Sequence, residues 1–389
     1  MISGTAKYVI LSDFNVRSNN RGTAALGYGA LAFLQSKGFI DDDFEIVKFR
    51  FHRYPWSKIP KEKVSELDIN GRKWKLHEIS VWALEKYLYR FRIHFLNTLF
   101  GRTIRRVRLV AAINGGDGLT DLYGNKLLDS RLPEMKMAIE FRIPFIVMPQ
   151  TIGPFLNQDN KDRILSIIGK AQKIYVRDTN FVQELDSKGI KYELVNDLSY
   201  YMQPEPFPID IKHPCVGLNV SGLAYSNKFG NLAGEFDSYP MLMEETVSLF
   251  RTKGCNVYII PHSYNTDTPE ENNDDMVACR QFYDSLEDKN GVIFVDRNLI
   301  SPQIKYLISR MDFFIGTRMH ANYAAIFTDT PVFGLAYSYK FKGAFERNGI
   351  FDRVALINNL KKTDIKGLLS EIESAYDHDV KSKGTKQDE

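Results

Sequence analysis

The chain has few cysteines, little net charge and no long apolar run, and each shortage argues against a class of protein. Three dispersed cysteines (Cys215, Cys255 and Cys279) show no metal-ligand spacing, so we expect buried free thiols in a reducing compartment. The formal net charge of +3 is too small to indicate nucleic-acid binding, so any basic surface must be local. No apolar run approaches the roughly 20 residues that span a bilayer, and the N-terminus lacks the pattern of a signal peptide. We therefore expect a cytoplasmic protein.

What the chain does contain is a regular alternation of apolar strands and helices over 389 residues, more than one core usually supports. A proline-rich stretch at residues 203–214 is the expected domain boundary. We therefore expect an α/β protein with two Rossmann-like, doubly wound domains that face a central cleft. The expected parts are a first domain over residues 1–203 with an insertion at about 50–108, a second domain over 215–362, a helix over 363–377 that packs back on the first domain, and a disordered tail over 378–389.

The expected insertion combines weak periodicity with many charges. Residues 55–75 are predicted to be an inserted or mobile loop. Apolar residues then recur every three or four positions from Val81 to Leu99, which predicts an amphipathic helix surrounded by arginines and aromatic residues. Such a helix is typical of a peripheral membrane contact, here over residues 81–108. A helix packed on the sheet with a solvated cationic face would explain the same pattern, so both interpretations stay open.

Glycine or polar residues follow four successive apolar strands of the first half. These segments are 114–121, 149–154, 177–179 and 196–197. In an open parallel sheet, ligands bind at the carboxyl ends of the strands. The layout therefore predicts a ligand edge, although tight strand-to-helix turns need glycine in any case.

The most informative stretch runs from Phe313 to Ile326. A short buried strand is followed by the small-residue turn Gly316-Thr317 and by an alanine-rich segment that we expect to be helical. Arg318 and His320 then lie at the start of that helix, where free backbone amides and the helix dipole favour an anion. We infer an anion-binding site with a histidine beside it. A structural ion pair of Arg318 is the alternative.

Arg177 follows a strand of the first domain in the same way. Arg177 and Arg318, from opposite lips of a cleft, would suit a small ligand with two anionic groups, because arginine binds carboxylate and phosphate in a bidentate manner. His320 is then the obvious group beside the site that can exchange a proton near neutral pH.

Together these segments resemble the polysaccharide pyruvyl transferase family, over roughly residues 8–345. The block from Gly316 to Ala321, with the proline and the tyrosine–lysine pair that follow it, is the most specific part. One departure is Thr23, where the family's first turn usually has aspartate in the pattern Asn-x-Gly-Asp. The matching segments are Gly115-Gly116-Asp117-Gly118, Gln150-Thr151-Ile152-Gly153-Pro154, Val176-Arg177-Asp178, Gly316-Thr317-Arg318-Met319-His320-Ala321, Pro331 and Ala336-Tyr337-Ser338-Tyr339-Lys340.

The resemblance implies a glycosyltransferase-B-like fold and the transfer of pyruvate from phosphoenolpyruvate, a co-substrate, to a sugar, usually as a ketal that bridges two hydroxyls. It also implies that Arg177 and Arg318 bind this donor, and that His320 contacts the donor and acts as the catalytic acid. No further cofactor is expected. The other expected donor-binding residues are Gly116 and Lys340, and the possible acceptor-binding or supporting residues are Asn20, Asp117, Gln150, Asp178 and His262.

A cluster of carboxylates raises the question of a metal. Glu270, Glu271, Asp274 and Asp275 lie at an expected helix start, where capping and dipole stabilisation explain them, so we expect no metal requirement.

The implied acceptor is a sugar of a polysaccharide, capsule or cell-wall precursor, which in this family is often lipid-linked. The protein would then act in the cytoplasm, and at the inner face of the membrane if its basic segment contacts lipid. Two alternative functions stay open. One is a nucleotide-sugar-dependent glycosyltransferase of the same architecture, and the other is a non-catalytic relative that binds sugar or phosphate.

Overall fold

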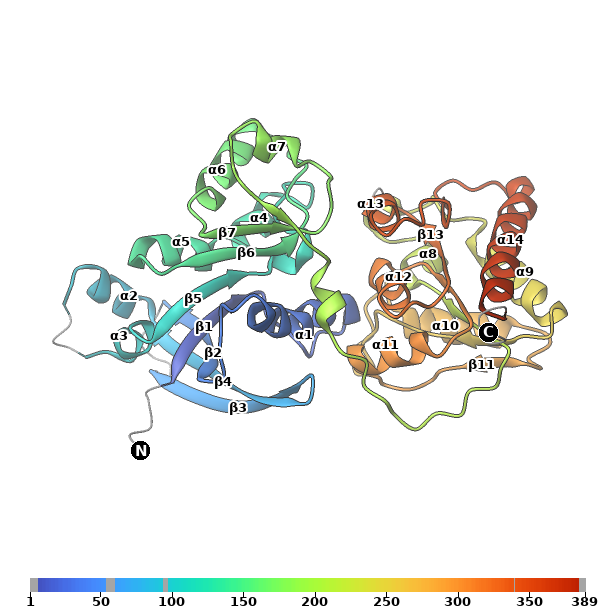
Figure 1. Cartoon of the computed structure of the whole chain (residues 1–389), viewed down its shortest axis with the longest axis horizontal. Helices are drawn as coiled ribbons and strands as arrows, with labels where there is room; N and C mark the ends of the chain where they lie inside the picture. The colour runs from blue at the N-terminus through green and yellow to red at the C-terminus, as the bar shows by residue number, and fades with distance from the viewer. Residues whose placement is uncertain (1–5, 54–59, 94–96, 339, 385–389) are drawn as a thin grey trace. The chain divides into compact units, whose positions relative to one another are not determined.

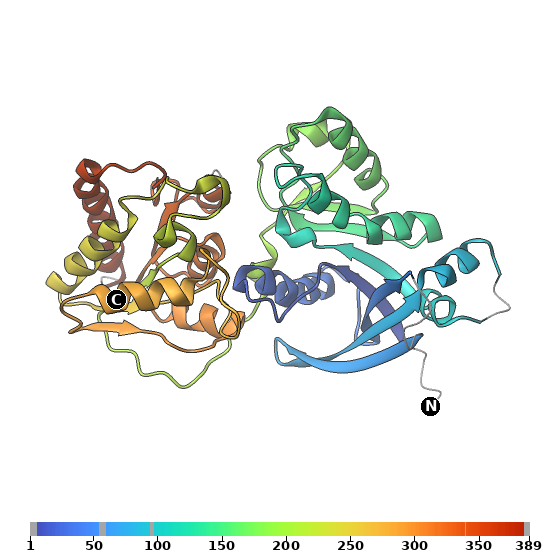
Figure 2. The same cartoon turned by 180° about the vertical axis from the view of Figure 1, so that it is seen from behind.

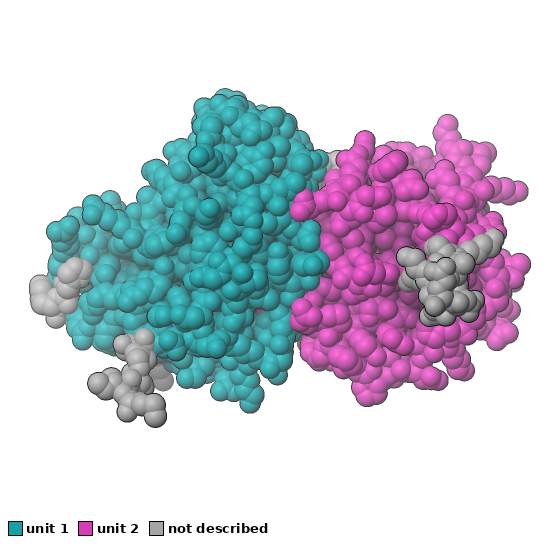
Figure 3. All heavy atoms as spheres, viewed as in Figure 1, with its two compact units in different colours: residues 1–15, 26–201 teal, residues 16–25, 202–389 magenta. Residues whose placement is uncertain are grey.

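The computed structural model describes residues 6–53, 60–93, 97–338 and 340–384. The chain divides into two compact units, coloured separately in Figure 3. The first consists of residues 1–15 and 26–201, and the second of residues 16–25 and 202–389. The segment 16–25 thus belongs to the second unit, which the sequence did not indicate.

The first unit is built on an eight-stranded sheet in the order β3-β4-β2-β1-β5-β6-β7-β8 (Figures 1 and 2). Neighbouring strands are parallel except β3 and β4, which form an antiparallel hairpin. Strand β6 is buried along its whole length, as expected where helices cover both faces of a parallel sheet. The strands are β1 (Lys7–Ser12), β2 (Phe44–His52), β3 (Lys61–Ile69), β4 (Arg72–Trp82), β5 (Val107–Ala112), β6 (Phe145–Gln150), β7 (Lys173–Val176) and β8 (Glu193–Leu194).

Helices cover both faces of this sheet. Ile174 and Val176 of β7 face the core formed with α3 to α7, whereas Tyr175 between them packs edge-on against Phe33 of α1 on the other face, with ring centroids 4.9 Å apart. The helices of the first unit are α1 (Arg21–Ser36), α2 (Ala83–Arg90), α3 (Leu99–Ile104), α4 (Asn125–Ser130), α5 (Pro133–Phe141), α6 (Gln158–Ile168) and α7 (Gln183–Asp186), with short 3-10 turns η2 (Asn114–Gly116) and η3 (Leu198–Tyr201).

The second unit has a parallel six-stranded sheet in the order β11-β10-β9-β12-β13-β14. Helices α8, α9, α10 and α14 contribute to the core on one face, and α11, α12 and α13 to the core on the other. The strands are β9 (Cys215–Asn219), β10 (Asn256–Ile259), β11 (Val292–Phe294), β12 (Phe313–Gly316), β13 (Val332–Ala336) and β14 (Val354–Leu356). The helices are α8 (Gly222–Ser226), α9 (Tyr239–Thr252), α10 (Asp275–Ser285), α11 (Ser301–Ser309), α12 (Met319–Ile326), α13 (Lys340–Arg347) and α14 (Ile365–Gly384), with 3-10 turns η4 (Gly230–Leu232) and η5 (Lys362–Asp364).

Each sheet has one point at which the order of the strands reverses. It lies between β1 and β5 in the first unit and between β9 and β12 in the second. In open α/β sheets, ligands bind outside the carboxyl ends of the strands at such a point. The predicted α/β class with two Rossmann-like units is therefore confirmed, and each unit contains its own candidate ligand edge.

The predicted insertion is wrong in its details. Residues 61–82 form the β3–β4 hairpin instead of a loop, and residues 54–59 lie outside the described part of the chain. The expected single helix from Val81 to Leu99 is also absent, because Val81 lies in β4 and two short helices, α2 and α3, follow. The hairpin was missed because β3 is an edge strand with little buried surface: only Leu67 and Ile69 of its nine residues are buried, and the other seven show no simple alternation.

The C-terminal helix also differs from its prediction. It packs within the second unit, where Leu368, Ile372 and Tyr376 join the same core as residues of α9, whereas packing on the first domain stays a prediction. It continues to Gly384, so residues 378–384 are helical instead of a disordered tail, while residues 385–389 lie outside the described part. An amphipathic stripe predicts that a face is buried but not which neighbour buries it.

Two bulk predictions can also be compared with the structure. The three cysteines are free and buried, as expected. None of the helices in the described part of the chain has both the length and the apolar character needed to cross a bilayer.

Candidate active site

The turn after β12 lies at the reversal point of the second sheet, where the sequence placed an anion site. The Asn219 side chain, at the end of neighbouring β9, accepts a hydrogen bond from the Arg318 amide at 2.8 Å. The Asn322 side chain donates to the Gly316 carbonyl oxygen at 2.9 Å. A side chain at Gly316 would collide with Asn322, since a Cβ there would lie 2.5 Å from its Oδ1. Glycine at this position therefore allows the close approach that shapes the turn.

Arg318 is buried and held by a carboxylate that the sequence did not assign to it. Asp275, at the start of α10, accepts from Arg318 Nε at 3.0 Å and from Nη2 at 2.7 Å. Nη2 also donates to the backbone and side-chain oxygens of Asn273, both at 2.8 Å. Burial alone would lower the pKa of Arg318, but Asp275 and the Tyr337 hydroxyl outweigh burial and raise it. Arg318 is therefore a fixed, permanently charged group.

Asp275 also organises the backbone around the arginine. Its Oδ1 accepts from the Gly222 amide at 2.8 Å, and its Oδ2 accepts from the amides of His262 and Ser263 at 3.1 and 2.8 Å. Asp274, in contrast, caps α10 by accepting from the Val277 amide at 3.1 Å, as predicted. The two neighbouring acids thus have different roles, and only Asp275 belongs to the candidate site.

His320 lies in the first turn of α12, beside the loop that precedes α1. A Cβ built on Gly22, the second residue of α1, would lie 2.5 Å from His320 Nδ1 and 3.1 Å from the Asn20 side-chain oxygen, so the start of α1 and the imidazole are in direct contact. The Asn20 side chain accepts from the amides of Gly22 and Thr23, at 3.0 and 3.4 Å, and so fixes the start of α1. The imidazole also packs edge-on against Tyr323, with ring centroids 5.8 Å apart.

Arg21, two residues before Thr23, anchors this loop. The guanidinium of Arg21 lies over the Tyr264 ring at 4.3 Å and donates to the Leu299 carbonyl oxygen at 2.8 Å. It also donates to the Asn298 side chain at 2.9 Å. Arg21 therefore places a second buried cation near the turn, and its sequence neighbourhood contained no signal for this packing.

His262 is the second histidine of the cluster, and it is buried. Burial lowers its pKa well below the ordinary value, and the positive charges of His320, Arg318 and Arg21 lower it further. The folded protein therefore holds His262 as a neutral imidazole at neutral pH. The positive charge at this turn lies on Arg318, on Arg21 and, when it is protonated, on His320.

We expect His262 to make the stability of the protein depend on pH. The unfolded chain binds a proton at His262 near pH 6.5, whereas burial depresses the folded-state pKa. The contribution of neutral His262 is therefore fully present above the unfolded pKa and is lost as pH falls below it, by up to about 1.4 kcal/mol per pH unit. In thermal unfolding, His262→Asn should flatten the fall in Tm on the acid side, whereas His378→Asn, at an exposed histidine, should not. An unchanged pH profile in His262→Asn would show that the folded protein protonates this imidazole normally.

In the first unit, the turn after β5 lies at the other reversal point. Gly116 has a positive φ of 82°, and a Cβ there would lie 2.9 Å from Arg177 Nη1. Arg177 is only 2% exposed: its Nη1 donates to Asp197 at 2.9 Å and its Nε to the Thr151 hydroxyl at 3.1 Å. The buried ion pair with Asp197 is by itself a structural reason for an arginine at position 177. A direct contact between Arg177 and a donor stays a prediction.

The supporting residues of the first unit form part of the same scaffold. Gln150 is fully buried and donates to the Ala112 carbonyl oxygen at 2.8 Å, which ties the ends of β5 and β6 together. Asp178 accepts from the Thr151 hydroxyl and from the Asn180 amide. Asp117 accepts from the Tyr123 hydroxyl at 3.0 Å. The side chain of Lys340, the first residue of α13, lies outside the described part of the structure.

The structure thus brings the predicted residues together in two groups, each within one unit. Asn20, His262, Arg318 and His320 gather at the carboxyl edge of the second sheet, and the predicted residues of the first unit gather around the Gly116 turn. The predicted convergence of Arg177 and Arg318 on one ligand involves both units and stays a prediction. Asp275, Asn219 and Asp197 are the buried partners that sequence reasoning missed.

One trio in the described residues has the composition of a metal site. Atoms of His213, Cys215 and Asp312 that could bind a metal lie within 4.8 Å of one another. Burial raises the pKa of the Cys215 thiol to about 12, however, so the thiolate that a metal prefers is disfavoured. The Asp312 carboxylate already accepts from the Cys215 amide at 2.8 Å and lies 2.9 Å from His213 Nδ1. These contacts describe a carboxylate that anchors the start of β9.

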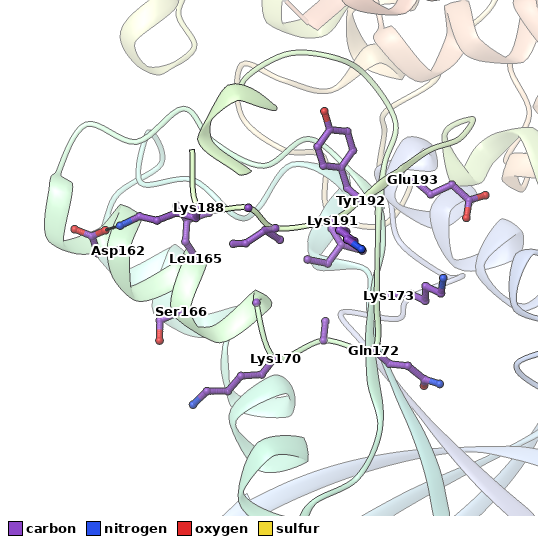
Figure 4. A pocket seen from close by; sticks show the side chains of 15 residues that line it. Asp162, Leu165, Ser166, Lys170, Gln172, Lys173, Lys188, Lys191, Tyr192 and Glu193 are labelled. Atoms are coloured by element: carbon purple, nitrogen blue, oxygen red, sulfur yellow. Dashed lines mark ion pairs between the residues drawn. The ribbon is translucent and has the colours of Figure 1, made fainter. Parts of the chain in front are cut away.

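A hollow of about 960 Å³ lies in the first unit at the amino ends of β7 and β8, the edge opposite the Gly116 turn. Lys170, Lys173, Lys188 and Lys191 are among its lining residues. Figure 4 shows that Lys188 pairs with Asp162, while Lys170 and Lys173 point to opposite sides. Because the lysines do not converge on one point, we assign no ligand to this hollow.

Comparison with known proteins agrees with this architecture. The UDP-GlcNAc 2-epimerase from Methanocaldococcus jannaschii has a TM-score of 0.53 and 9% identity, over 95% of this chain and 92% of that one. The S. aureus protein MnaA, solved with UDP, has a TM-score of 0.51 and 10% identity, over 96% and 90%. At such low identity the similarity concerns the fold alone. No curated protein sequence matches this chain.

Two Rossmann-like α/β units of this kind define a glycosyltransferase-B-like protein. The model of the family described as polysaccharide pyruvyl transferase matches residues 20–339. The chain therefore belongs to the polysaccharide pyruvyl transferase family, and the resemblance of its motifs is confirmed.

Proposed function

We propose that this protein transfers the pyruvyl group of phosphoenolpyruvate to a sugar of a polysaccharide or glycan precursor, forms a pyruvate ketal and releases phosphate. The observation that carries the proposal is the charge of the turn after β12. Arg318 is held rigidly by Asp275, and His320 lies two residues further on, at the start of α12. Membership of the polysaccharide pyruvyl transferase family supports pyruvyl transfer as the reaction, and a buried cationic turn suits an anionic donor.

The donor carries a carboxylate and a phosphate group of about −1.5 to −2 charge. We propose that Arg318 and the amides at the start of α12 bind one of these groups. Because Asp275 fixes the guanidinium beforehand, little side-chain entropy is lost when the anion binds. Arg177 is the predicted partner for the other group, and Lys340 is a predicted additional cation.

The chemistry requires a proton at a defined carbon. Protonation of the donor's methylene carbon by His320 turns it into a methyl group and makes the neighbouring carbon electrophilic. One sugar hydroxyl then adds to that carbon and loses its proton. The phosphate then leaves with the bonding electrons, and a second hydroxyl adds to the same carbon, gives its proton to the departing phosphate and closes the ketal. A general acid in this position typically contributes about 10²–10⁴-fold in rate.

The decisive experiment measures inorganic phosphate released from phosphoenolpyruvate in the presence and absence of a panel of sugar and lipid-linked sugar acceptors. We expect release only with a suitable acceptor, together with a product whose mass and NMR spectrum show a pyruvate ketal. Sugar transfer from a nucleotide donor without turnover of phosphoenolpyruvate would instead identify a glycosyltransferase. Binding of phosphoenolpyruvate without turnover, under every acceptor, would identify a non-catalytic relative.

A further inference from the structure

Helix α2 presents an apolar ridge to solvent. Leu84, Tyr87 and Phe91 are 60%, 54% and 70% exposed. Their spacing of three and four residues places them on one face of the helix and of the turn that ends it. We call these three residues the α2 ridge. When large apolar side chains gather on one exposed face, that face often binds a protein, a membrane or a ligand.

The ridge is exposed although its helix is firmly held. The Glu85 carboxylate, on the opposite side of α2, accepts from the Phe100 amide of α3 at 3.0 Å. Tyr89 packs edge-on against Phe100 and Phe141, and Lys86 pairs with Glu140 of α5 at 3.0 Å. Figures 1 and 2 both show α2 and α3 side by side at one end of the first unit. The exposure of the ridge is therefore a property of the packed fold.

Positive charge is concentrated and poorly neutralised along the segment that begins with the ridge. Residues 83–108 contain seven lysines and arginines and a single acid, Glu85, which is buried. Four of the arginines are exposed and have no ion pair within the described part of the chain. Two of these arginines donate instead to backbone oxygens and one to the side-chain oxygen of Asn97. The four arginines, which we call the arginine belt, are Arg92, Arg102, Arg105 and Arg108.

We propose that the α2 ridge and the arginine belt form a docking surface for a membrane that contains anionic phospholipid. Aromatic and aliphatic side chains on one face of a helix enter the boundary between headgroups and acyl chains, while neighbouring arginines attract the anionic headgroups. A folded protein partner fits less well, since a stable interface needs about 800 Å² per partner around an apolar centre. Three ridge side chains on a segment rich in arginine do not supply such a centre. An anionic polymer fits less well too, because it would bind the arginines but would leave the apolar ridge without a partner.

The position of this surface is compatible with catalysis elsewhere in the unit. Helix α3 leads into the amino end of β5, whereas the Gly116 turn follows its carboxyl end. The six residues of β5 span ~20 Å at about 3.3 Å per residue. A membrane bound at one end of the strand therefore leaves the candidate ligand edge at the other end uncovered.

The test is co-sedimentation of the full chain with phosphatidylcholine vesicles that do or do not contain phosphatidylglycerol. We expect pelleting only with the anionic vesicles and its loss at high salt. The triple variant Leu84→Ser/Tyr87→Ser/Phe91→Ser and the triple variant Arg92→Gln/Arg102→Gln/Arg105→Gln should each bind at least tenfold more weakly. In the single variant Phe91→Trp, the new indole should show a blue-shifted emission when anionic vesicles are added.

Matched controls separate a specific surface from general charge. The variant Lys170→Gln/Lys173→Gln/Lys191→Gln removes three exposed lysines from the amino edge at β7 and β8 and should bind like the wild type. Phe351→Ser alters an equally exposed aromatic residue of the second unit and should also bind normally. All variants should keep the thermal unfolding profile of the wild type, because the changed side chains are exposed. The proposal would be overturned if either the ridge variant or the belt variant bound anionic vesicles normally, or if the lysine control lost as much binding as they do. It would also be overturned if the protein bound an anionic polymer but not the vesicles.

Discussion

Replacing His320 with alanine is expected to lower the turnover of phosphoenolpyruvate by about 10²–10⁴-fold, while binding of the donor stays close to that of the wild type. The imidazole lies at the start of α12, two residues beyond the fixed charge of Arg318, and contacts the start of α1 at Gly22. Removing it takes away the proposed proton donor but leaves the ion pair of Arg318 with Asp275 intact. Initial rates of phosphate release measure the turnover, and titration calorimetry with phosphoenolpyruvate measures the binding.

Two further variants define what such a loss means. His320→Gln keeps a polar side chain of similar length but cannot exchange a proton near neutral pH, so it should be nearly as inactive as His320→Ala. His378→Ala makes the same substitution at an exposed histidine of α14 and should retain full activity. Near-normal turnover in His320→Ala would remove the histidine from the mechanism. If His320→Ala lost donor affinity by as large a factor as turnover, the histidine would bind the donor by its charge instead of transferring a proton.

The fold was largely predictable because its main strands are short buried apolar runs. Strands β6 and β12 have no exposed residue, so each can be recognised in the sequence as a short apolar run. The turn after β12 was predictable for the same reason. Arg318 and His320 follow a buried strand and two small residues and come at the start of an alanine-rich helix, so they had to lie at the turn. Strand β3 was not predictable, because it lies at the sheet edge and carries charged residues along most of its length.

The partners in the site were not predictable from their sequence positions. Asp275 lies 43 residues before Arg318, and an acid at a helix start equally well describes a cap, which is the role of its neighbour Asp274. Asp197 lies 20 residues after Arg177 and follows β8, which has only two residues. Local patterns indicate where a strand ends. Only the folded chain shows which carboxylate lies opposite a given arginine.

The largest effect on stability is expected from Asp275→Ala. The substitution leaves the Arg318 guanidinium buried without the carboxylate that now receives its Nε and Nη2, and it deprives the amides of Gly222, His262 and Ser263 of their acceptor. Removing one partner of a buried ion pair typically costs about 3–5 kcal/mol. Chemical denaturation should therefore show a free energy of unfolding lower by about this amount, or a second unit that no longer folds.

Asp274→Ala is the matched control for this prediction, because it makes the same change at the adjacent residue. It removes the helix cap of α10 and one acceptor for the Asn265 amide, but no partner of a buried charge, and should cost about 0.5–2 kcal/mol. The double variant Asp275→Leu/Arg318→Met should recover part of the loss, since buried ion pairs can often be replaced by apolar side chains of similar volume. That double variant should nevertheless bind phosphoenolpyruvate weakly, because it lacks the proposed donor-binding charge. Equal, small losses in Asp275→Ala and Asp274→Ala would mean that Arg318 does not depend on this carboxylate, and that the rigid cation on which the proposed site rests is held by other groups.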